Sequence, residues 1–298
     1  MKYHEPALLK ESIDGLEVNP GGVYVDVTFG GGGHSAEILK RLENGRLIAF
    51  DQDKDAEKNA FEDDRFLFIR QNFRFMGNFL KFYGIRQVDG IIADLGISFH
   101  QVDVPGRGFS FRFEGDLDLR MNQLAKVKAS DILNTYPGED LEILFREYGE
   151  IRDASRITRL ILNARGAKPI LKISEFMEVL SPWLPKEKPN KILAKVFQAL
   201  RMEVNKEVDS LKELLVQASE YLKPGGRLVV LSYHSLEDRL VKNFMKKGKF
   251  EGEIEKDLYG NFEVPFKMLN KSVITPSSKE VERNKRARSA KLRIAEKI

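Results

Sequence analysis

The sequence predicts an α/β fold in which a parallel sheet, covered by helices on both faces, is interrupted by an all-helical insertion. Three observations support this prediction. Short apolar runs alternate with helical patterns over about the first ninety residues. Strand signal then disappears for about a hundred residues, in which apolar positions recur three and four apart. It returns directly after a helix stop at 223–226, Lys-Pro-Gly-Gly.

The alternating part is expected to supply five buried strands. Each is a short apolar run bounded by turn residues, and the runs cover 23–27, 46–50, 65–69, 88–93 and 226–232. A helix from about His34 to Leu42 follows the first run, and two short antiparallel strands at 262–264 and 272–274 are expected to close the sheet. Strand and helix alternation at this spacing implies right-handed crossovers, so the five strands end at the same edge of the sheet.

The insertion is predicted from a loop at 105–108 and from helical stripes beyond it. Two stripes are typical of helix faces that pack into a core: Leu141, Leu144, Phe145 and Tyr148, and then Ile157, Leu160, Ile161 and Ala164. We therefore expect a discontinuous α/β domain formed by residues 1–110 and 206–298. A separate helical domain is expected over residues 111–205.

Composition excludes several classes of protein. With 42% apolar and 32% charged residues among 298, the chain can form a packed core with a heavily solvated surface. The absence of cysteine excludes disulfides, a thiolate nucleophile and cysteine-ligated metals. No apolar run reaches the roughly 18 residues of a membrane span, and the N-terminus shows no secretory signal. The four histidines lie in separate segments, so no metal site is expected, and a cytoplasmic location is predicted.

Positive charge is concentrated at the C-terminal end. Residues 279–298 hold eight Lys or Arg and three Glu, a net charge of +5, which leaves about −1 for the rest of a chain of net charge +4. Such a patch can neutralise phosphates or can be a solvated terminal helix. We expect Leu292, Ile294 and Ala295 to anchor the segment while its cations face RNA phosphates. These cations are Arg283, Lys285, Arg286, Arg288, Lys291 and Arg293, of which the first four are the predicted RNA-binding residues.

A glycine-rich turn follows the first expected strand. Four consecutive glycines, residues 30–33, allow the backbone to turn sharply and to approach a ligand closely. Asp51 ends the next strand, 18 residues after Gly33, where a carboxylate can accept both hydroxyls of a ribose or can cap the following helix. A nicotinamide dinucleotide and S-adenosylmethionine both suit this pattern. Phe73 can line an adenine slot, and Asp94 ends the fourth strand at the same edge.

Seven motifs in order along the chain carry a resemblance to a known family. They span 26–30, 32–35, 94–98, 107–111, 117–121, 197–205 and 233–239, and read DVTFG, GGHS, DLGIS, RGFSF, LDLRM, FQALRMEVN and YHSLEDR. Together they resemble the bacterial small-subunit ribosomal RNA cytosine-N4-methyltransferases, the MraW family, over nearly the whole chain from His4. Where the family pattern has a second serine and a proline after Ser98, this chain has Phe99-His100.

The resemblance implies a Rossmann-like class I methyltransferase sheet and S-adenosylmethionine as cofactor. It implies methylation of the exocyclic N4 of a decoding-centre cytidine in 16S ribosomal RNA, with the small ribosomal subunit as partner and the helical domain as the substrate-recognition part. The cofactor would be held by residues that match the family pattern: Gly32, Gly33, His34, Asp51, Phe73, Asp94 and Gln101.

Three residues are candidates for the chemistry. Asp94 or a neighbouring backbone carbonyl can accept a hydrogen from the amine that is methylated, and Asp94 can alternatively bind the methionine ammonium of the cofactor. Tyr233 and His234 follow the fifth strand toward the same edge, where an aromatic ring can stack on a base. Two other functions explain part of the pattern. A dinucleotide oxidoreductase explains the glycine turn and Asp51, and a non-catalytic ribosome-assembly factor explains the basic tail.

Overall fold

The computed structural model describes residues 6–253 and 263–298, and the chain divides into two compact units. The first unit consists of the chain up to Gly96 and from Asp209 onward, and the second of Ile97–Val208. The second unit begins earlier than the predicted residue 111. The difference arises because α4 (Phe99–Asp103) and the short helix η3 (Pro105–Arg107) belong to it rather than to the sheet.

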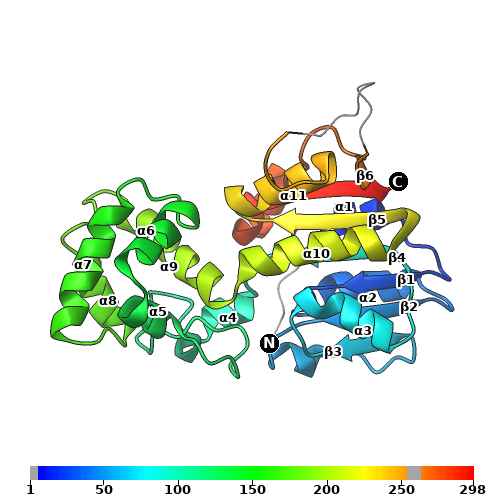
Figure 1. Cartoon of the computed structure of the whole chain (residues 1–298). Helices are drawn as coiled ribbons and strands as arrows, with labels where there is room; N and C mark the ends of the chain where they lie inside the picture. The colour runs from blue at the N-terminus through cyan, green and yellow to red at the C-terminus, as the bar shows by residue number, and fades with distance from the viewer. Residues whose placement is uncertain (1–5, 254–262) are drawn as a thin grey trace. The chain divides into compact units, whose positions relative to one another are not determined.

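The first unit is built on a seven-stranded sheet in the order β3-β2-β1-β4-β5-β7-β6 (Figure 1). The first five strands along the chain are parallel, and β7 runs antiparallel to both β5 and β6. This arrangement confirms the predicted α/β class and the Rossmann-like sheet. The strands are β1 (Val23–Asp26), β2 (Arg46–Phe50), β3 (Phe66–Ile69), β4 (Val88–Asp94), β5 (Leu222–Ser232), β6 (Phe266–Met268) and β7 (Lys291–Lys297).

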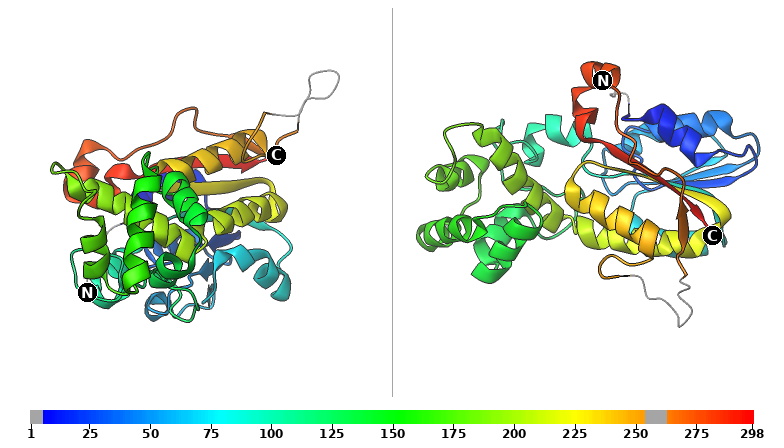
Figure 2. Two further views of the ribbon diagram at one scale, coloured as in Figure 1. Left: turned by 60° about the vertical axis from the view of Figure 1, so that its left-hand side comes forward. Right: turned by 90° about the horizontal axis from the view of Figure 1, so that it is seen from above.

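Helices cover both faces of this sheet. Figure 2, right, shows α1 on one face and α10 and α11 on the other. Tyr24 and Ile92 lie in a core cluster with Leu16 of α1, and Phe50 of β2 packs edge-on against Phe79 of α3, with ring centroids 6.1 Å apart. The helices of this unit are α1 (Leu9–Leu16), α2 (Gly33–Arg41), α3 (Met76–Phe82), α10 (Glu207–Tyr221), α11 (Ser235–Lys247) and α12 (Ser278–Arg283), with short helices η1 (Ala56–Asn59), η2 (Phe73–Phe75) and η4 (Lys285–Ser289).

The second unit is helical and has its own core. The two predicted apolar stripes are confirmed as core faces: Leu141, Leu144, Phe145, Ile157 and Ile161 are buried, and the remaining three pack against them. Besides α4 and η3 its helices are α5 (Ala129–Thr135), α6 (Gly138–Glu147), α7 (Ala154–Ala167), α8 (Ile173–Leu180) and α9 (Pro189–Val204). No helix in the described residues has the length and apolarity needed to cross a membrane.

Two predictions about the end of the sheet are wrong in detail. The helix α10 ends at Tyr221, just before the predicted helix stop at 223–226, but the strand expected from Gly226 begins earlier, at Leu222. Residues 223–226 lie inside β5, because the strand pairs at Leu222 with Val88 and then at Arg227 with Gly90, and the four intervening residues bulge out with Gly225 at φ 81°. The strands expected at 262–264 and 272–274 are replaced by β6 and β7. Ile274 forms only an isolated bridge to Leu292, and residue 262 lies outside the described residues.

The basic tail is likewise not a solvated helix. Its last part is strand β7, which lies between β5 and β6, and Leu292 and Ala295 are fully buried there. Two cations that were expected to face RNA phosphates instead bind a carboxylate of α11: Arg293 Nε donates a 2.7 Å hydrogen bond to Asp238 Oδ1, and Lys291 Nζ donates one of 3.4 Å to Asp238 Oδ2. The apolar residues of the tail therefore anchor it as a strand of the sheet.

Candidate active site

Three carboxylates gather at the carboxyl edge of the sheet. Asp26 ends β1, Asp51 directly follows β2 and Asp94 ends β4, and these three strands are neighbours. Asp26 is buried, and Asp51 and Asp94 are partly buried. In the described part of the chain no Lys or Arg side chain forms an ion pair with any of them. The site is thus a concentration of negative charge in a poorly solvated place.

The glycine turn wraps closely around neighbouring side chains. Gly30 and Gly32 have φ of 51° and 76°, in the left-handed region that other residues rarely adopt. A Cβ at Gly32 would lie 2.9 Å from the ring of Phe61, and one at Gly33 would lie 2.3 Å from Cγ of Pro6. The turn therefore needs glycine for both its conformation and its packing.

Asp51 is fixed by backbone amides on both sides of the turn. Its Oδ2 accepts a 2.8 Å hydrogen bond from Gly30 N, and its Oδ1 accepts a 2.8 Å bond from Asp53 N. The residue that precedes η1 is Asp55, so Asp51 does not cap that helix. Burial raises the pKa of Asp51 to about 6, against the effect of these two hydrogen bonds. Because a carboxylate has about four acceptor positions, two remain for a ligand.

Asp94 is held by two partners at the end of β4. Its backbone N donates a 2.6 Å hydrogen bond to Thr28 Oγ1, and its Oδ1 accepts a 2.7 Å bond from the Tyr233 hydroxyl. Burial raises the pKa of Asp94 to about 7, helped by the charges of Asp26 and Glu237, while the tyrosine hydrogen bond lowers it. Near neutral pH this carboxyl group therefore exists in both protonation states. The hydrogen bond from Tyr233 goes to Oδ1 and not to the other carboxylate oxygen of Asp94, Oδ2.

His34 and Asp26 lie beside this group. His34 lies in the first turn of α2 and is buried, and its Nδ1 is 3.9 Å from Oδ2 of Asp94. Burial lowers the pKa of His34 to about 4, so the ring is neutral at physiological pH. Asp26 accepts hydrogen bonds from Ser35 Oγ at 2.6 Å and from Thr28 N at 3.0 Å, and burial raises its pKa to about 6.

His234 is oriented by a glutamate that sequence reasoning missed. His234 caps the N-terminus of α11, and its Nε2 lies 2.9 Å from Oε1 of Glu237. The other oxygen of Glu237 accepts a 3.1 Å hydrogen bond from Tyr233 N. One buried carboxylate therefore contacts both candidate residues after β5. The signal was present in the motif YHSLED, where the acid stands three residues after the histidine.

The remaining predicted cofactor residues divide between the units. Phe73 begins η2 directly after β3, in the first unit, and is partly buried. Gln101 belongs to α4 in the second unit, where it is buried and closes a capping box with Ser98. Its role toward a ligand of the first unit stays a prediction.

The segment before α1 contacts α12 beside the glycine turn, which the sequence did not predict. The backbone N of Leu8 donates a 2.7 Å hydrogen bond to Oε1 of Glu280, 272 residues away in α12. Leu8 has φ 50°, and Pro6 packs on Gly33. Glu280 therefore anchors the segment that contacts the turn. The four predicted RNA-binding cations follow Glu280 and are all exposed: Arg283, Lys285, Arg286 and Arg288.

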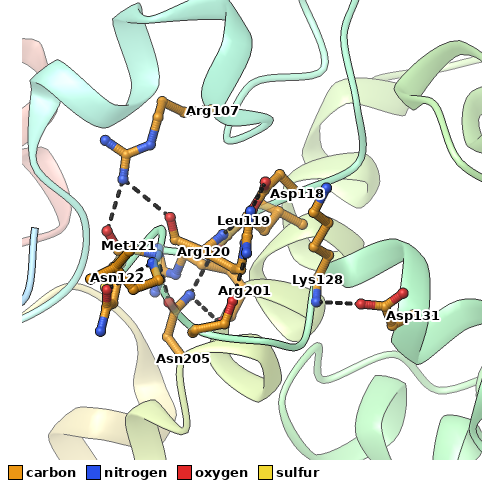
Figure 3. Close-up of polar contacts among 12 residues, drawn as sticks. Arg107, Asp118, Leu119, Arg120, Met121, Asn122, Lys128, Asp131, Arg201 and Asn205 are labelled. Carbon is orange, nitrogen blue, oxygen red and sulfur yellow. Dashed lines mark hydrogen bonds and ion pairs between the residues drawn. The ribbon is translucent and has the colours of Figure 1, made fainter.

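In the second unit, three of the motif blocks join in one polar network. Figure 3 shows the guanidinium of Arg107 pointing to the carbonyls of Arg120 and Met121, with donor–acceptor distances of 3.1 and 2.9 Å. The Asn205 side chain bridges the same loop, accepting from Met121 N at 2.7 Å and donating to Leu119 O at 2.8 Å. Blocks 107–111, 117–121 and 197–205 thus fix one loop conformation.

Comparison with known proteins shows the family to which the chain belongs. The model of the MraW methylase family matches residues 1–298, the whole chain. The chain belongs to the MraW methylase family. A Flavobacterium johnsoniae protein named Ribosomal RNA small subunit methyltransferase H is 57% identical over 299 residues, covering 100% of this chain and 99% of that protein. A Bacteroides thetaiotaomicron protein of the same name is 56% identical, covering 100% of this chain and 98% of that protein.

Membership in the MraW methylase family makes the chain a methyltransferase and decides against the dinucleotide oxidoreductase and the non-catalytic assembly factor. A solved rRNA methylase from Streptococcus thermophilus aligns with a TM-score of 0.42 at 12% identity, covering 97% of this chain and 95% of that one. Within residues 6–253 and 263–298, no three His, Asp or Glu side chains are arranged to hold a metal ion.

Proposed function

We propose that this MraW-family methyltransferase uses S-adenosylmethionine to methylate the exocyclic N4 of a decoding-centre cytidine in 16S ribosomal RNA, within the small ribosomal subunit in the cytoplasm. The observation that carries the proposal is the group of three carboxylates around the glycine turn, in a chain that shares 57% identity with a protein named as a small-subunit ribosomal RNA methyltransferase.

The residues at this edge suit a cationic cofactor. Burial raises the pKa of Asp26, Asp51 and Asp94 to about 6, 6 and 7, which means that each carboxylate lacks charge compensation in the structure. A ligand with a sulfonium and an ammonium group supplies that compensation. An anionic dinucleotide would add negative charge to the same place. The carboxylates therefore favour S-adenosylmethionine over a nicotinamide cofactor.

Several of the predicted residues are proposed to hold this cofactor. Asp51 offers two acceptor positions for the ribose hydroxyls, and Phe73, directly after β3, offers a ring for the adenine. The glycine turn brings the backbone close to the ligand. His34, buried directly after this turn, is neutral and adds no positive charge to the cofactor site. Gln101 is proposed as a further cofactor contact from the match to the family pattern.

Asp94 is proposed to accept the proton that the cytidine amine loses. Cytosine N4 is a weak nucleophile because its lone pair is delocalised into the ring, and the bound S-adenosylmethionine supplies a methyl group that is strongly electrophilic. An ionised Asp94 can bind an amine hydrogen through Oδ2 and so localise the lone pair. The Tyr233 hydroxyl holds the carboxylate in place and keeps part of it ionised near pH 7.

His234 and Tyr233 are proposed to bind the target base. Tyr233 presents an aromatic ring beside Asp94, and the Glu237 contact holds the imidazole of His234 in one orientation. Glu237 is thus a positioning residue, since it acts through its two neighbours. The helical unit, residues 97–208, is proposed to recognise the RNA around the base, and the exposed cations at 283–288 are proposed to bind its phosphates.

The experiment is methyl transfer from isotopically labelled S-adenosylmethionine to purified small ribosomal subunits, and in parallel to protein-free 16S ribosomal RNA. The RNA is then digested to nucleosides and analysed by mass spectrometry. The proposal predicts labelled N4-methylcytidine, formed by the wild type and strongly reduced in the matched variant Asp94→Asn. Labelled 5-methylcytidine, a ribose methyl group, or no labelled nucleoside with either substrate would contradict it.

A further inference from the structure

The segment from Arg65 to Val88 has an unusual composition. It holds five cations and no acid, together with seven aromatic residues in 24 positions. It includes β3, η2, α3 and the turn that leads into β4. A run of cations interleaved with aromatic rings is the residue pattern with which proteins bind single-stranded nucleic acids.

The turn at the end of α3 displays two of these aromatic rings. Phe82 is 80% exposed and Tyr83 is 41% exposed, and their rings contact edge to face with centroids 5.2 Å apart. The turn is well determined by hydrogen bonds, because Ile85 N donates to Leu80 O and Gly84 N donates to Lys81 O, as in a Schellman motif. Gly84 has φ 69°. The two rings are therefore held outward by the backbone.

The charges of the segment differ in their surroundings. Arg65, Arg70 and Arg74 form ion pairs with Asp63, Glu57 and Glu213. Lys81 and Arg86, which flank Phe82 and Tyr83, are exposed, and in the described part of the chain neither has a carboxylate within ion-pair distance. The two uncompensated cations of the segment thus stand on either side of the two exposed rings of the turn, Phe82 and Tyr83.

We propose that Lys81, Phe82, Tyr83 and Arg86, here called the α3 turn surface, bind a single-stranded stretch of RNA. Bases would stack on the rings of Phe82 and Tyr83, and phosphates would bind the two cations. The inference rests on the proposed function in one respect, that the substrate is RNA. A second copy of this chain is the less suitable partner, because a two-fold interface would bring the same cations together.

The α3 turn surface is separate from the methyl-transfer site. Helix α3 starts beyond the carboxyl end of β3, close to Phe73, and runs to the amino end of β4. Its seven residues span about 10 Å, so the exposed rings lie toward the opposite edge of the sheet from Asp51 and Asp94. The surface is therefore expected to hold RNA at a distance from the target base, and to affect substrate affinity without touching the cofactor.

The test measures binding of a fluorescent single-stranded oligouridine by anisotropy at several salt concentrations. The double variant Phe82→Ser, Tyr83→Ser is compared with the control Ile298→Ser, which changes an apolar side chain that is 61% exposed in the same unit and lies outside the surfaces proposed to bind RNA. We expect the double variant to bind at least about fivefold more weakly, since one lost base stack changes affinity by that factor or more. The control should bind like the wild type.

A second variant tests the cations. Lys81→Gln with Arg86→Gln should reduce the slope of log affinity against log salt by about 1.4, which is two phosphate contacts on a single strand. Affinity and slope equal to wild type in both variants would overturn the proposal. So would an equally strong effect on a duplex of the same length, or a loss of dimer in the variants on sedimentation.

Measuring the affinity for S-adenosylmethionine distinguishes a refutation of the α3 turn surface from a refutation of the proposed function. Both variants should bind S-adenosylmethionine like the wild type, because neither changes the glycine turn or the three carboxylates. If the wild type methylates small subunits and the variants bind RNA normally, only the α3 turn surface is refuted. If the wild type neither binds RNA nor transfers a methyl group, the proposed function fails together with it.

Discussion

Replacing Asp94 by asparagine should make the ligand-free protein more stable at neutral and alkaline pH. The pKa of Asp94 is raised from its ordinary value of 3.8 to about 7, chiefly by burial. A group whose pKa is raised in the folded state stabilises the fold fully below its ordinary pKa, and that contribution is lost as pH rises through the folded pKa. In the wild type, the loss falls between pH 4 and pH 7.

The two pKa values set the size of the effect. Between pH 5 and pH 8 the wild type loses about 2 to 3 kcal/mol of unfolding free energy through this one carboxyl group. Asp94→Asn does not ionise, so its unfolding free energy relative to wild type should rise by that amount over the same interval. The amide oxygen of asparagine can still accept the Tyr233 hydroxyl, which limits other changes at the site.

Urea unfolding at pH 5 and pH 8 without ligand measures this difference. Circular dichroism is the better signal, because the only tryptophan, Trp183, lies in the second unit. Asp64→Asn, which makes the same substitution at an exposed position of the loop before β3, is the matched control. A free-energy difference between Asp94→Asn and wild type that stays constant from pH 5 to pH 8, or that falls, would refute the reasoning.

Three further predictions concern ligand binding. Asp51→Ala should bind S-adenosylmethionine about tenfold or more weakly while remaining folded, because ribose hydroxyls lose their acceptor at about 1 to 3 kcal/mol; titration calorimetry measures this. Tyr233→Phe removes the hydrogen bond that lowers the pKa of Asp94, so the pH profile of methyl transfer should move to higher pH. A quadruple variant replaces Arg283, Lys285, Arg286 and Arg288 by glutamine. It should bind RNA several-fold more weakly, and its slope of log affinity against log salt should fall by up to about 3 to 4, with cofactor affinity unchanged.

Each of these has a result that would count against it. An unchanged S-adenosylmethionine affinity in folded Asp51→Ala would remove that residue from the site. A pH profile of Tyr233→Phe identical to wild type would show that Asp94 does not govern the rate. A quadruple variant that keeps its RNA affinity and salt slope would make the segment 283–288 a solvated surface only.

The sequence predicted the parts of the fold that depend on local pattern. The strands at 23–26, 46–50, 66–69 and 88–94 lie within one or two residues of their predicted bounds, because each is a short apolar run closed by turn residues. The apolar faces of the helices in the second unit were predicted from their three- and four-residue spacing. Strand β7 was missed because three Lys or Arg side chains in Lys291–Lys297 suggested a solvated tail. Asp238, which binds Arg293 and Lys291 at this strand, comes from a distant helix.

In the candidate site, too, features with a local sequence signal were predicted and long-range contacts were not. Asp51 and Asp94 were found because each follows a readable strand, and a strand end at a parallel sheet edge is a local signal. The hydrogen bond from Tyr233 to Asp94 spans 139 residues, and that from Leu8 to Glu280 spans 272. Contacts at such separations depend on how the chain packs, which spacing along the sequence does not encode. The raised pKa of Asp26 likewise depends on burial by several elements.

The most direct test of the carboxylate site is a count of the protons exchanged when S-adenosylmethionine binds, by calorimetry in buffers of different ionisation enthalpy. If a cationic ligand ionises Asp26, Asp51 and Asp94, whose pKa values are about 6, 6 and 7, binding at pH 6.5 should release about one proton. At pH 8 it should release clearly fewer, and Asp94→Asn should lose more than half of the release at pH 6.5. No release, or proton uptake, at pH 6.5 would contradict the account.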